Sequence, residues 1–381
     1  MTELRKTPVG IATYTVGLDS RVEDLKKRFI DDKSNRVQVL GLHGMGGIGK
    51  TTLATALFNK LVGHFESRSF ILNVKDISKE DGGLVKLQNK LLRDLSPNWP
   101  LVNNIDKGID GIKMLVHEKR VLIVLDDVDD VSQLNALAGN RSWFGEGSRV
   151  IVTTRNKAVL AEHLVNEFYD VRELGYPEAL QLFSYHALRK DKPTEEYMNI
   201  SKEIVSLTGG LPLALEVFGS TLFNERGLNR WEDALKKLQR IRPHNLQDVL
   251  RISYDELDED GKHVFLDIAC LFFKMGMKRE EAIDILKGCG FSAETVIRVL
   301  TSKCLIKIRE DDELWMHDQL RDMGRQIVQH ENLADPGGRS RLWDRGEIMS
   351  TLMRKKVHLI TLYIHIHPLF FFIVFKSSIY N

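Results

Sequence analysis

Several features that mark other classes of protein are scarce or absent in this sequence. Only three cysteines occur among 381 residues (Cys270, Cys289 and Cys304), too few for a disulfide framework, which favours a reducing compartment. Excess charge is also absent, because 54 lysines and arginines nearly balance 53 aspartates and glutamates, for a formal net charge of +1. This balance argues against a strongly cationic nucleic-acid or membrane-surface binder. Residues 1–10 hold no apolar run, which argues against a secretory signal.

What the sequence does contain is the composition of a folded protein. Hydrophobic residues make up 43% and charged residues 28%, values that exclude wholesale disorder. At about 150 residues per domain, the length predicts two or three domains.

Short apolar runs alternate with helical patterns up to residue 172. We predict strands at 37–42, 70–74, 121–125, 150–153 and 168–171. The third run, Val-Leu-Ile-Val-Leu, has no polar alternation, which indicates burial on both faces. The alternation predicts an α/β fold with a doubly wound parallel sheet over residues 16–172, after an N-terminal linker at 1–15.

Helices dominate the rest of the chain. Amphipathic patterns predict a helical subdomain over 173–248. Residues 249–350 add helices and then two short β-like runs, which indicates a winged-helix subdomain. The tail, residues 351–381, is mostly apolar and approaches the length of a membrane span. Three histidines and Pro368 interrupt it, so we do not expect contact with a membrane.

The strongest motif is a phosphate-binding loop. Residues 44–51 read Gly-Met-Gly-Gly-Ile-Gly-Lys-Thr, a full match to GxxxxGK[ST] between a predicted strand and a predicted helix. The glycines let the backbone turn successive N–H groups toward one anion, and the helix N-terminus adds a positive dipole end. Lys50 supplies a cation for the β- and γ-phosphates, and Thr51 offers a hydroxyl to Mg²⁺. The predicted nucleotide-binding residues here are Gly44, Gly46, Gly47, Ile48, Gly49, Lys50, Thr51 and Thr52. A glycine-rich turn with an incidental lysine is the alternative, and the strand–helix context argues against it.

Charged residues follow two other predicted strands. Asp126 and Asp127 end the buried strand, at the sheet edge where ligands bind in such folds. We predict that Asp126 is an outer-sphere partner of Mg²⁺ and that Asp127 orients or activates the attacking water. Arg155, after the next strand, could contact the γ-phosphate. The alternatives are helix-capping aspartates and a solvated arginine.

Five motifs occur in order and together resemble the NB-ARC module of plant nucleotide-binding leucine-rich-repeat immune receptors. The resemblance covers residues 16–350, and Asp129 resembles the residue of the TIR-type branch. The motifs are residues 44–51, Leu-Asp-Asp-Val-Asp at 125–129, Ser-Arg-Val-Ile-Val-Thr-Thr-Arg at 148–155, Gly-Leu-Pro-Leu-Ala at 210–214 and Met-His-Asp at 316–318.

The resemblance implies further roles in binding ADP or ATP. It implies that Val16 and Gly17 border the adenine, that Pro212 packs on the base, and that His317 reaches the β-phosphate of ADP. Pro212 could instead simply begin a helix, and His317 could be an ordinary partly buried histidine.

The sequence departs from the family pattern at both ends. The family's receptors normally begin with a TIR domain and continue into leucine-rich repeats, and we find neither in residues 1–381. We therefore expect a truncated gene product or translated non-coding sequence.

One leading hypothesis and three alternatives are consistent with these motifs. The leading hypothesis is an ADP/ATP switch of plant immunity that is closed with ADP, opens and oligomerises with ATP, and is reset by slow hydrolysis. The alternatives are a turnover ATPase of the AAA type, an inert fragment, and DNA binding through the winged helix, which the neutral charge disfavours. We expect a cytoplasmic or nucleocytoplasmic protein that self-associates or associates with full-length receptors.

Overall fold

The computed structural model describes residues 10, 14–30, 35–117, 119–160, 164–223, 225, 227–241, 246–272, 276–309, 311–353, 362–367 and 370–375. Contacts within the chain divide it into two compact units, Met1–Leu174 and Gly175–Asn381.

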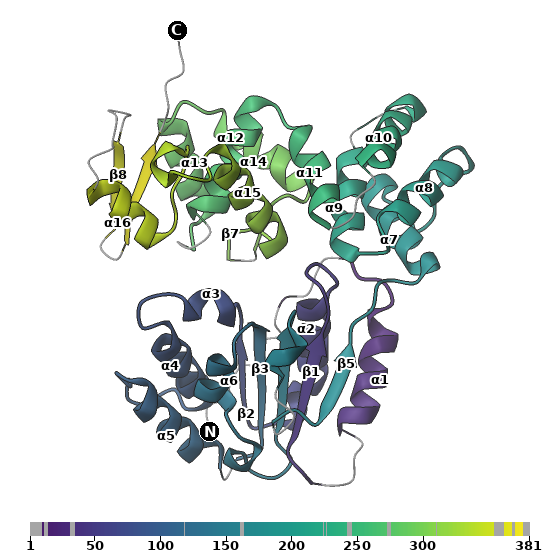
Figure 1. The fold of residues 1–381 in the computed structure, drawn as a ribbon. Helices are drawn as coiled ribbons and strands as arrows, with labels where there is room; N and C mark the ends of the chain where they lie inside the picture. The colour runs from purple at the N-terminus through teal and green to yellow at the C-terminus, as the bar shows by residue number, and fades with distance from the viewer. Residues whose placement is uncertain are drawn as a thin grey trace. The chain divides into compact units, whose positions relative to one another are not determined.

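A five-stranded parallel sheet forms the centre of the first unit (Figure 1). The strand order is β2-β3-β4-β1-β5. Their bounds are β1 Gln38–His43, β2 Ser67–Ile71, β3 Val121–Val128, β4 Arg149–Thr154 and β5 Glu167–Asp170. All five predicted strands are present, which confirms the α/β prediction. Strand β3 is buried along nearly its whole length because it lies inside the sheet and is covered on both faces.

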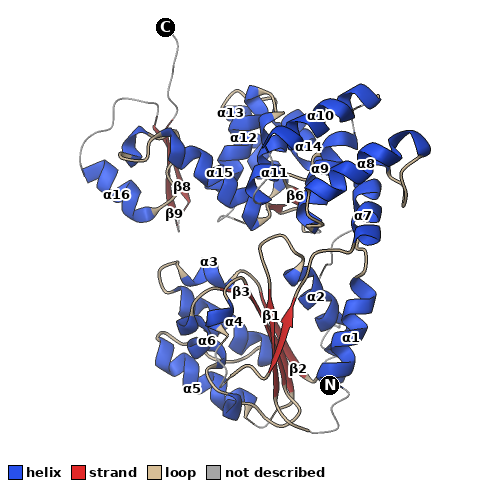
Figure 2. Cartoon of the chain, turned by 45° about the vertical axis from the view of Figure 1, so that its right-hand side comes forward, coloured by secondary structure: helices blue, strands red, loops and turns tan. Residues whose placement is uncertain are grey.

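Helices cover both faces of this sheet, as a doubly wound fold requires. Figures 1 and 2 show α1 and α2 on one side and α4, α5 and α6 on the other. The helices are α1 Leu18–Ile30, α2 Lys50–Leu61, α3 Val74–Ser78, α4 Gly83–Leu95, α5 Ile105–Val116 and α6 Val131–Ala138.

One strand ends earlier than the sequence predicts. The prediction placed it at 70–74, whereas β2 ends at Ile71. Asn73 takes a left-handed backbone conformation (φ 55°), and Val74 begins α3. The apolar run was therefore misread because it continues from the strand into a buried helix residue.

The second unit begins with helices α7 Tyr176–Leu188, α8 Glu195–Leu207, α9 Pro212–Phe223, α10 Leu228–Ile241 and α11 Leu246–Asp255. The side chain of Trp231 on α10 is only 1% exposed. The rings of Phe183 on α7 and Tyr197 on α8 lie against it, with centroids 5.8 Å and 4.6 Å away. This aromatic cluster joins three of the helices.

A winged-helix segment follows, with helices and a small antiparallel hairpin as the sequence predicts. The elements are α12 Glu259–Cys270, α13 Arg279–Gly288, α14 Ala293–Ser302, β6 Lys307–Ile308, β7 Leu314–Trp315, α15 Asp318–Glu331 and α16 Arg345–Met353. A buried ion pair joins the stretch between α15 and α16 to α12, because Arg341 Nε lies 2.6 Å from Asp267 Oδ1.

The apolar tail contains two paired strands. Leu362–His367 (β8) pairs antiparallel with Phe370–Phe375 (β9). In the described part of the chain, no helix combines the length and the apolar character that crossing a membrane requires.

Arg149, the first residue of β4, is a buried arginine that fixes the sheet to α1. Its side chain is 3% exposed. Nε donates to the Phe29 carbonyl at 2.6 Å, and Nη1 donates to the Arg36 carbonyl at 2.8 Å. The guanidinium also lies over the Phe29 ring, 5.6 Å from its centroid. One side chain thus satisfies carbonyls from separate segments.

We expect Arg149→Ala to lower the free energy of unfolding by about 2–4 kcal/mol, since buried carbonyls lose charge-assisted hydrogen bonds. Urea unfolding followed by circular dichroism measures the change. Arg93→Ala, on the exposed face of α4, should change the value by no more than about 0.5 kcal/mol. Equal effects of the two substitutions would contradict the anchoring role.

Candidate functional site

The glycine-rich loop connects the end of β1 at His43 to the start of α2 at Lys50. Gly47 and Gly49 have φ values of 75° and 95°, a left-handed region that favours glycine. Gly49 caps α2, so the loop leads directly to the N-terminus of that helix. Ile48 is buried at 2% exposure and anchors the loop to the unit's interior. The arrangement suits an anion, because backbone N–H groups and a helix dipole converge there.

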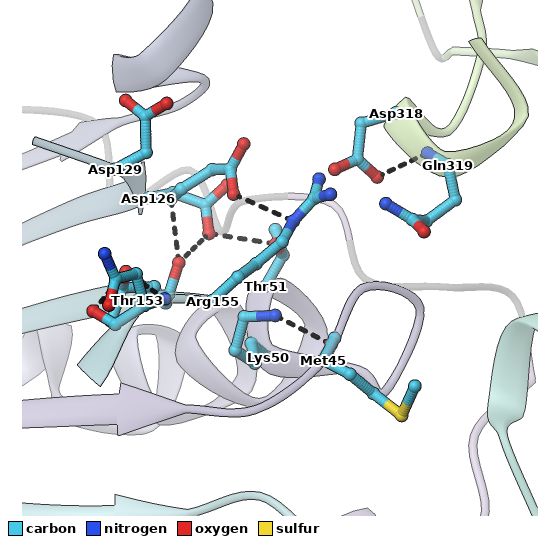
Figure 3. A network of polar contacts seen from close by, with 12 residues as sticks. Met45, Lys50, Thr51, Asp126, Asp129, Thr153, Arg155, Asp318 and Gln319 are labelled. Atoms are coloured by element: carbon cyan, nitrogen blue, oxygen red, sulfur yellow. Dashed lines mark hydrogen bonds and ion pairs between the residues drawn. The ribbon is translucent and has the colours of Figure 1, made fainter. Parts of the chain in front are cut away.

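Lys50 is folded back onto this loop. Its Nζ donates to the Gly44 carbonyl at 2.8 Å and to the Met45 carbonyl at 2.9 Å (Figure 3). Burial, helped by the charge of Arg155, lowers the pKa of Lys50 to about 8, against the opposing effect of Asp127 and Asp126. A phosphate beside the ammonium group would favour its charged form.

Asp126 lies in β3 and is 3% exposed. Its Oδ1 accepts hydrogen bonds from Thr51 Oγ1 at 2.9 Å and from Thr153 Oγ1 at 2.7 Å (Figure 3). Burial raises the pKa of this carboxyl to about 6, although the two hydroxyl donors lower it. A cation next to the group would stabilise its charged form. Hydroxyl and carboxylate oxygens are ligands that Mg²⁺ prefers, so this pair fits the predicted magnesium site.

Asp127 interrupts the regular geometry of β3. Its φ is 54°, and the pairing with β4 shifts register between Leu125 and Val128. In a regular strand, consecutive side chains point to opposite faces, so Asp126 and Asp127 would diverge. Here the Asp127 N–H donates to Thr153 Oγ1 at 2.8 Å, and its Oδ1 lies 3.5 Å from Arg155 Nε. The irregularity places both carboxylates beside residues of the same edge.

Arg155, the last of the residues predicted to contact the phosphates or Mg²⁺, also lies at this edge of the sheet. Arg155 directly follows β4, which ends at Thr154. Its side chain is 25% exposed. The structure therefore brings together the residues predicted from three separate motifs, namely Lys50, Thr51, Asp126, Asp127 and Arg155.

The predicted adenine-bordering residues precede α1. Gly17 has φ 65° and directly precedes Leu18, the first residue of that helix. Arg21, on α1, donates to the carbonyls of Arg172 at 2.9 Å and Glu173 at 3.1 Å. These bonds tie the segment after Val16 to the chain that leaves β5.

Pro212 and His317 belong to the second unit. Pro212 is the first residue of α9, where its fixed φ and missing N–H are tolerated. His317 caps the N-terminus of α15. Its Nδ1 lies 2.5 Å from Asp318 Oδ1 and 3.1 Å from the Gln319 N–H. The Gln319 N–H donates to His317 Nδ1, which is the contact that caps the helix, and also to Asp318 Oδ1 at 2.9 Å.

Sequence reasoning assigned no role to Thr153, although it connects both aspartates. Its hydroxyl donates to Asp126 and accepts from the Asp127 N–H. A signal was available, because threonine is a polar residue at the end of an otherwise apolar strand, two positions before Arg155. Such positions lie at the ligand-binding edge of parallel sheets.

Two family models match the chain. The NB-ARC domain model matches residues 18–193. A model described as the winged-helix domain of Roq1-like disease resistance proteins matches residues 258–332.

Curated plant proteins resemble most of the chain. Disease resistance protein RPV1 of Vitis rotundifolia is 42% identical over 344 residues, which are 90% of this chain and 24% of that protein. TMV resistance protein N of Nicotiana glutinosa is 38% identical, over 91% of this chain and 30% of that protein. The chain thus spans roughly a quarter to a third of the length of these relatives.

A solved structure shares the fold. It is a signal transduction ATPase with numerous domains and a tetratricopeptide repeat sensor, from Pyrococcus horikoshii. The TM-score is 0.52 with 16% identity, over 93% of this chain and 48% of that one.

Proposed function

The chain belongs to the NB-ARC family, with a winged-helix domain of the plant disease resistance type, and from this premise we propose that it is an adenine-nucleotide switch of plant immune signalling. ADP holds the resting state closed, and exchange for ATP opens the protein and lets it oligomerise. The observation that carries the proposal is the convergence of Lys50, Thr51 and Asp126 at one sheet edge. To change the ratio of open to closed molecules from 1:99 to 99:1, a ligand must bind the open state more tightly by about 5.5 kcal/mol.

Residues of the loop would hold the phosphates. Backbone N–H groups of residues 44–52 and the N-terminus of α2 bind the oxygens. Lys50 exchanges its bonds with the Gly44 and Met45 carbonyls for bonds with β- and γ-phosphate oxygens. Thr51 and Asp126 would hold Mg²⁺, Thr51 as a ligand and Asp126 as an outer-sphere partner. Mg²⁺ supplies positive charge that offsets the charge of the phosphates. In the second unit, Pro212 packs on the base and His317 binds the β-phosphate, while Val16 and Gly17 border the adenine.

Hydrolysis in this proposal is slow and resets the switch. Asp127 orients the attacking water and Arg155 contacts the γ-phosphate. The Asp127 carboxylate lies 3.5 Å from Arg155 Nε, so its charge is already paired with a cation. Steady-state hydrolysis of several ATP per second would instead support a turnover ATPase.

The nucleotide that co-purifies with the protein tests the proposal. We expect ADP at close to one molecule per chain, identified by chromatography after the protein is denatured. An empty site would contradict the closed, ADP-bound resting state. The proposal places the protein in the cytoplasm, or in the cytoplasm and nucleus, with copies of itself or full-length receptors as partners.

We expect replacement of Asp318 to shift the bound nucleotide from ADP toward ATP. Asp318 is the first residue of α15, and its Oδ1 contacts His317 Nδ1 and accepts the Gln319 N–H at 2.9 Å. Asp318→Ala removes both contacts, so His317 loses the partner that orients it. Asp322→Ala, one turn further along α15, should leave the ADP content unchanged. An unchanged ratio of ADP to ATP in Asp318→Ala would count against a role for this segment.

A further inference from the structure

Three side chains that can bind a metal lie together in the second unit. His186 is on α7, Glu216 is on α9, and Cys304 follows α14. One potential ligand atom from each lies within 4.8 Å of the others. His186 is buried, at 8% exposure, and Glu216 and Cys304 are partly buried. We propose that these three residues bind a single divalent transition-metal ion of the Zn²⁺ class.

The donor set selects this class of ion. Imidazole and thiolate suit Zn²⁺ and Co²⁺, whereas Mg²⁺ and Ca²⁺ prefer oxygen ligands. Bond lengths of about 2.0–2.3 Å to nitrogen, oxygen and sulfur place tetrahedral ligands roughly 3.3–3.8 Å apart. Ligand atoms within 4.8 Å therefore need only small side-chain movements to bind one ion. Burial lowers the pKa of His186 to about 4, so its ring is neutral at pH 7, the form that binds metal.

The surroundings of the cluster agree with such a site. Ser220 on α9 contacts two of the three residues, with Oγ 3.2 Å from His186 Nδ1 and 3.1 Å from Cys304 Sγ. Its hydroxyl or a water molecule can take the fourth position of a tetrahedral ion. Lys307 Nζ lies 2.6 Å from Glu216 Oε1, which supplies positive charge beside the carboxylate. The Lys307 side chain is 38% exposed and can move into solvent when a cation binds.

Charge balances when the ion binds. Burial, helped by the charge of Glu216, raises the pKa of the Cys304 thiol to about 11, so the thiol releases its proton to solvent only when the cation binds beside it. Glu216 is a carboxylate. Two negative ligands and one neutral imidazole neutralise a divalent cation. The ion would link α7 and α9 to the chain that enters the hairpin of β6 and β7, so it would fasten the helical segment to the winged-helix segment.

The backbone at Cys304 offers a well-matched test variant. Its φ is 54°, and it follows the end of α14. The Cys304 N–H donates to the Thr301 carbonyl at 3.1 Å, and the Leu305 N–H donates to the Leu300 carbonyl at 3.0 Å. These two bonds define a Schellman motif, whose left-handed position favours glycine. Cys304→Gly therefore removes the sulfur at a position where the backbone accepts the replacement.

Titration of the chelator-treated full chain with Co²⁺ tests the proposal. We expect one equivalent of Co²⁺ to bind below about 100 μM and to produce a thiolate-to-cobalt charge-transfer absorption band. Zn²⁺ should displace the Co²⁺ and abolish the band. Excess Mg²⁺ with ADP should leave it unchanged, because the P-loop site offers oxygen ligands and no thiolate.

Two variants within the cluster and one control variant outside it test whether the absorption band arises from the cluster. Cys304→Gly should lose it, and Glu216→Gln should weaken Co²⁺ binding at least tenfold. Cys289→Ser removes a thiol outside the cluster and should keep the band. Thermal unfolding of each variant shows that it is folded. Absence of the band at about 100 μM Co²⁺ would overturn the proposal, and so would its persistence in Cys304→Gly.

Discussion

Lys50→Ala should abolish retention of adenine nucleotide. We expect at least about 100-fold weaker binding, because two charge-assisted hydrogen bonds to phosphate, each contributing about 1.5–3 kcal/mol, are lost. The fold should persist, since Lys50 Nζ donates to the loop carbonyls of Gly44 and Met45 and the rest of α2 packs largely through its apolar residues. Isothermal titration with ADP and chromatography of extracted nucleotide measure the loss.

Lys60→Ala is the matched control for this experiment. Lys60 lies on the same helix, but its Nζ pairs with Glu23 Oε1 at 2.9 Å and it is half exposed. Its removal should leave nucleotide binding unchanged and alter stability by no more than about 1 kcal/mol. If Lys50→Ala retained ADP as well as Lys60→Ala does, the loop would not be the phosphate site.

Asp126→Asn should raise the stability of the protein and weaken its binding of Mg²⁺. In the absence of nucleotide and Mg²⁺, we expect the free energy of unfolding at pH 7 to rise by about 1–3 kcal/mol, because a buried carboxylate becomes a neutral amide of the same shape. The amide keeps an oxygen that can accept from Thr51 and Thr153. Nucleotide binding, however, should lose its dependence on Mg²⁺, because the carboxylate that partners the ion is gone.

Thermal unfolding with and without Mg²⁺ and ADP measures both effects. Asp129→Asn is the control, because Asp129 lies in the same segment and contacts Lys79 and Gln133 instead of Thr51. In that variant, nucleotide binding should depend on Mg²⁺ as it does in the unsubstituted protein. Retention of the same dependence by Asp126→Asn would place the magnesium site elsewhere.

The sheet was predictable because its strands obey simple rules. The run at 121–125 is apolar throughout, and strands buried on both faces of a parallel sheet have this pattern. The proximity of Lys50, Thr51, Asp126 and Arg155 was predictable because motifs that follow strands lie at the same sheet edge. The predicted end of β2 was wrong, because hydrophobic periodicity does not show where an apolar strand ends and a buried helix residue follows.

Contacts between segments far apart in the chain could not be predicted from the sequence. Arg149 reads as one charged residue before an apolar run, and only the folded chain brings its guanidinium to the carbonyls of Phe29 and Arg36. Likewise, His186, Glu216 and Cys304 have no motif spacing, and only the fold brings α7, α9 and the segment that follows α14 together. The sequence interpretation of the tail addressed only its length and polarity, and did not predict the pairing of β8 with β9.

The left-handed backbone at Asp127 and Cys304 has a consequence for protein engineering. A stabilisation screen that replaces non-glycine residues at positive φ with glycine would select both positions, because the change relieves local strain. At Asp127 it would remove the carboxylate that faces Arg155, and at Cys304 the sulfur that faces Ser220. Variants chosen for thermal tolerance alone would therefore lose the carboxylate proposed to orient water or the sulfur proposed to bind a metal ion.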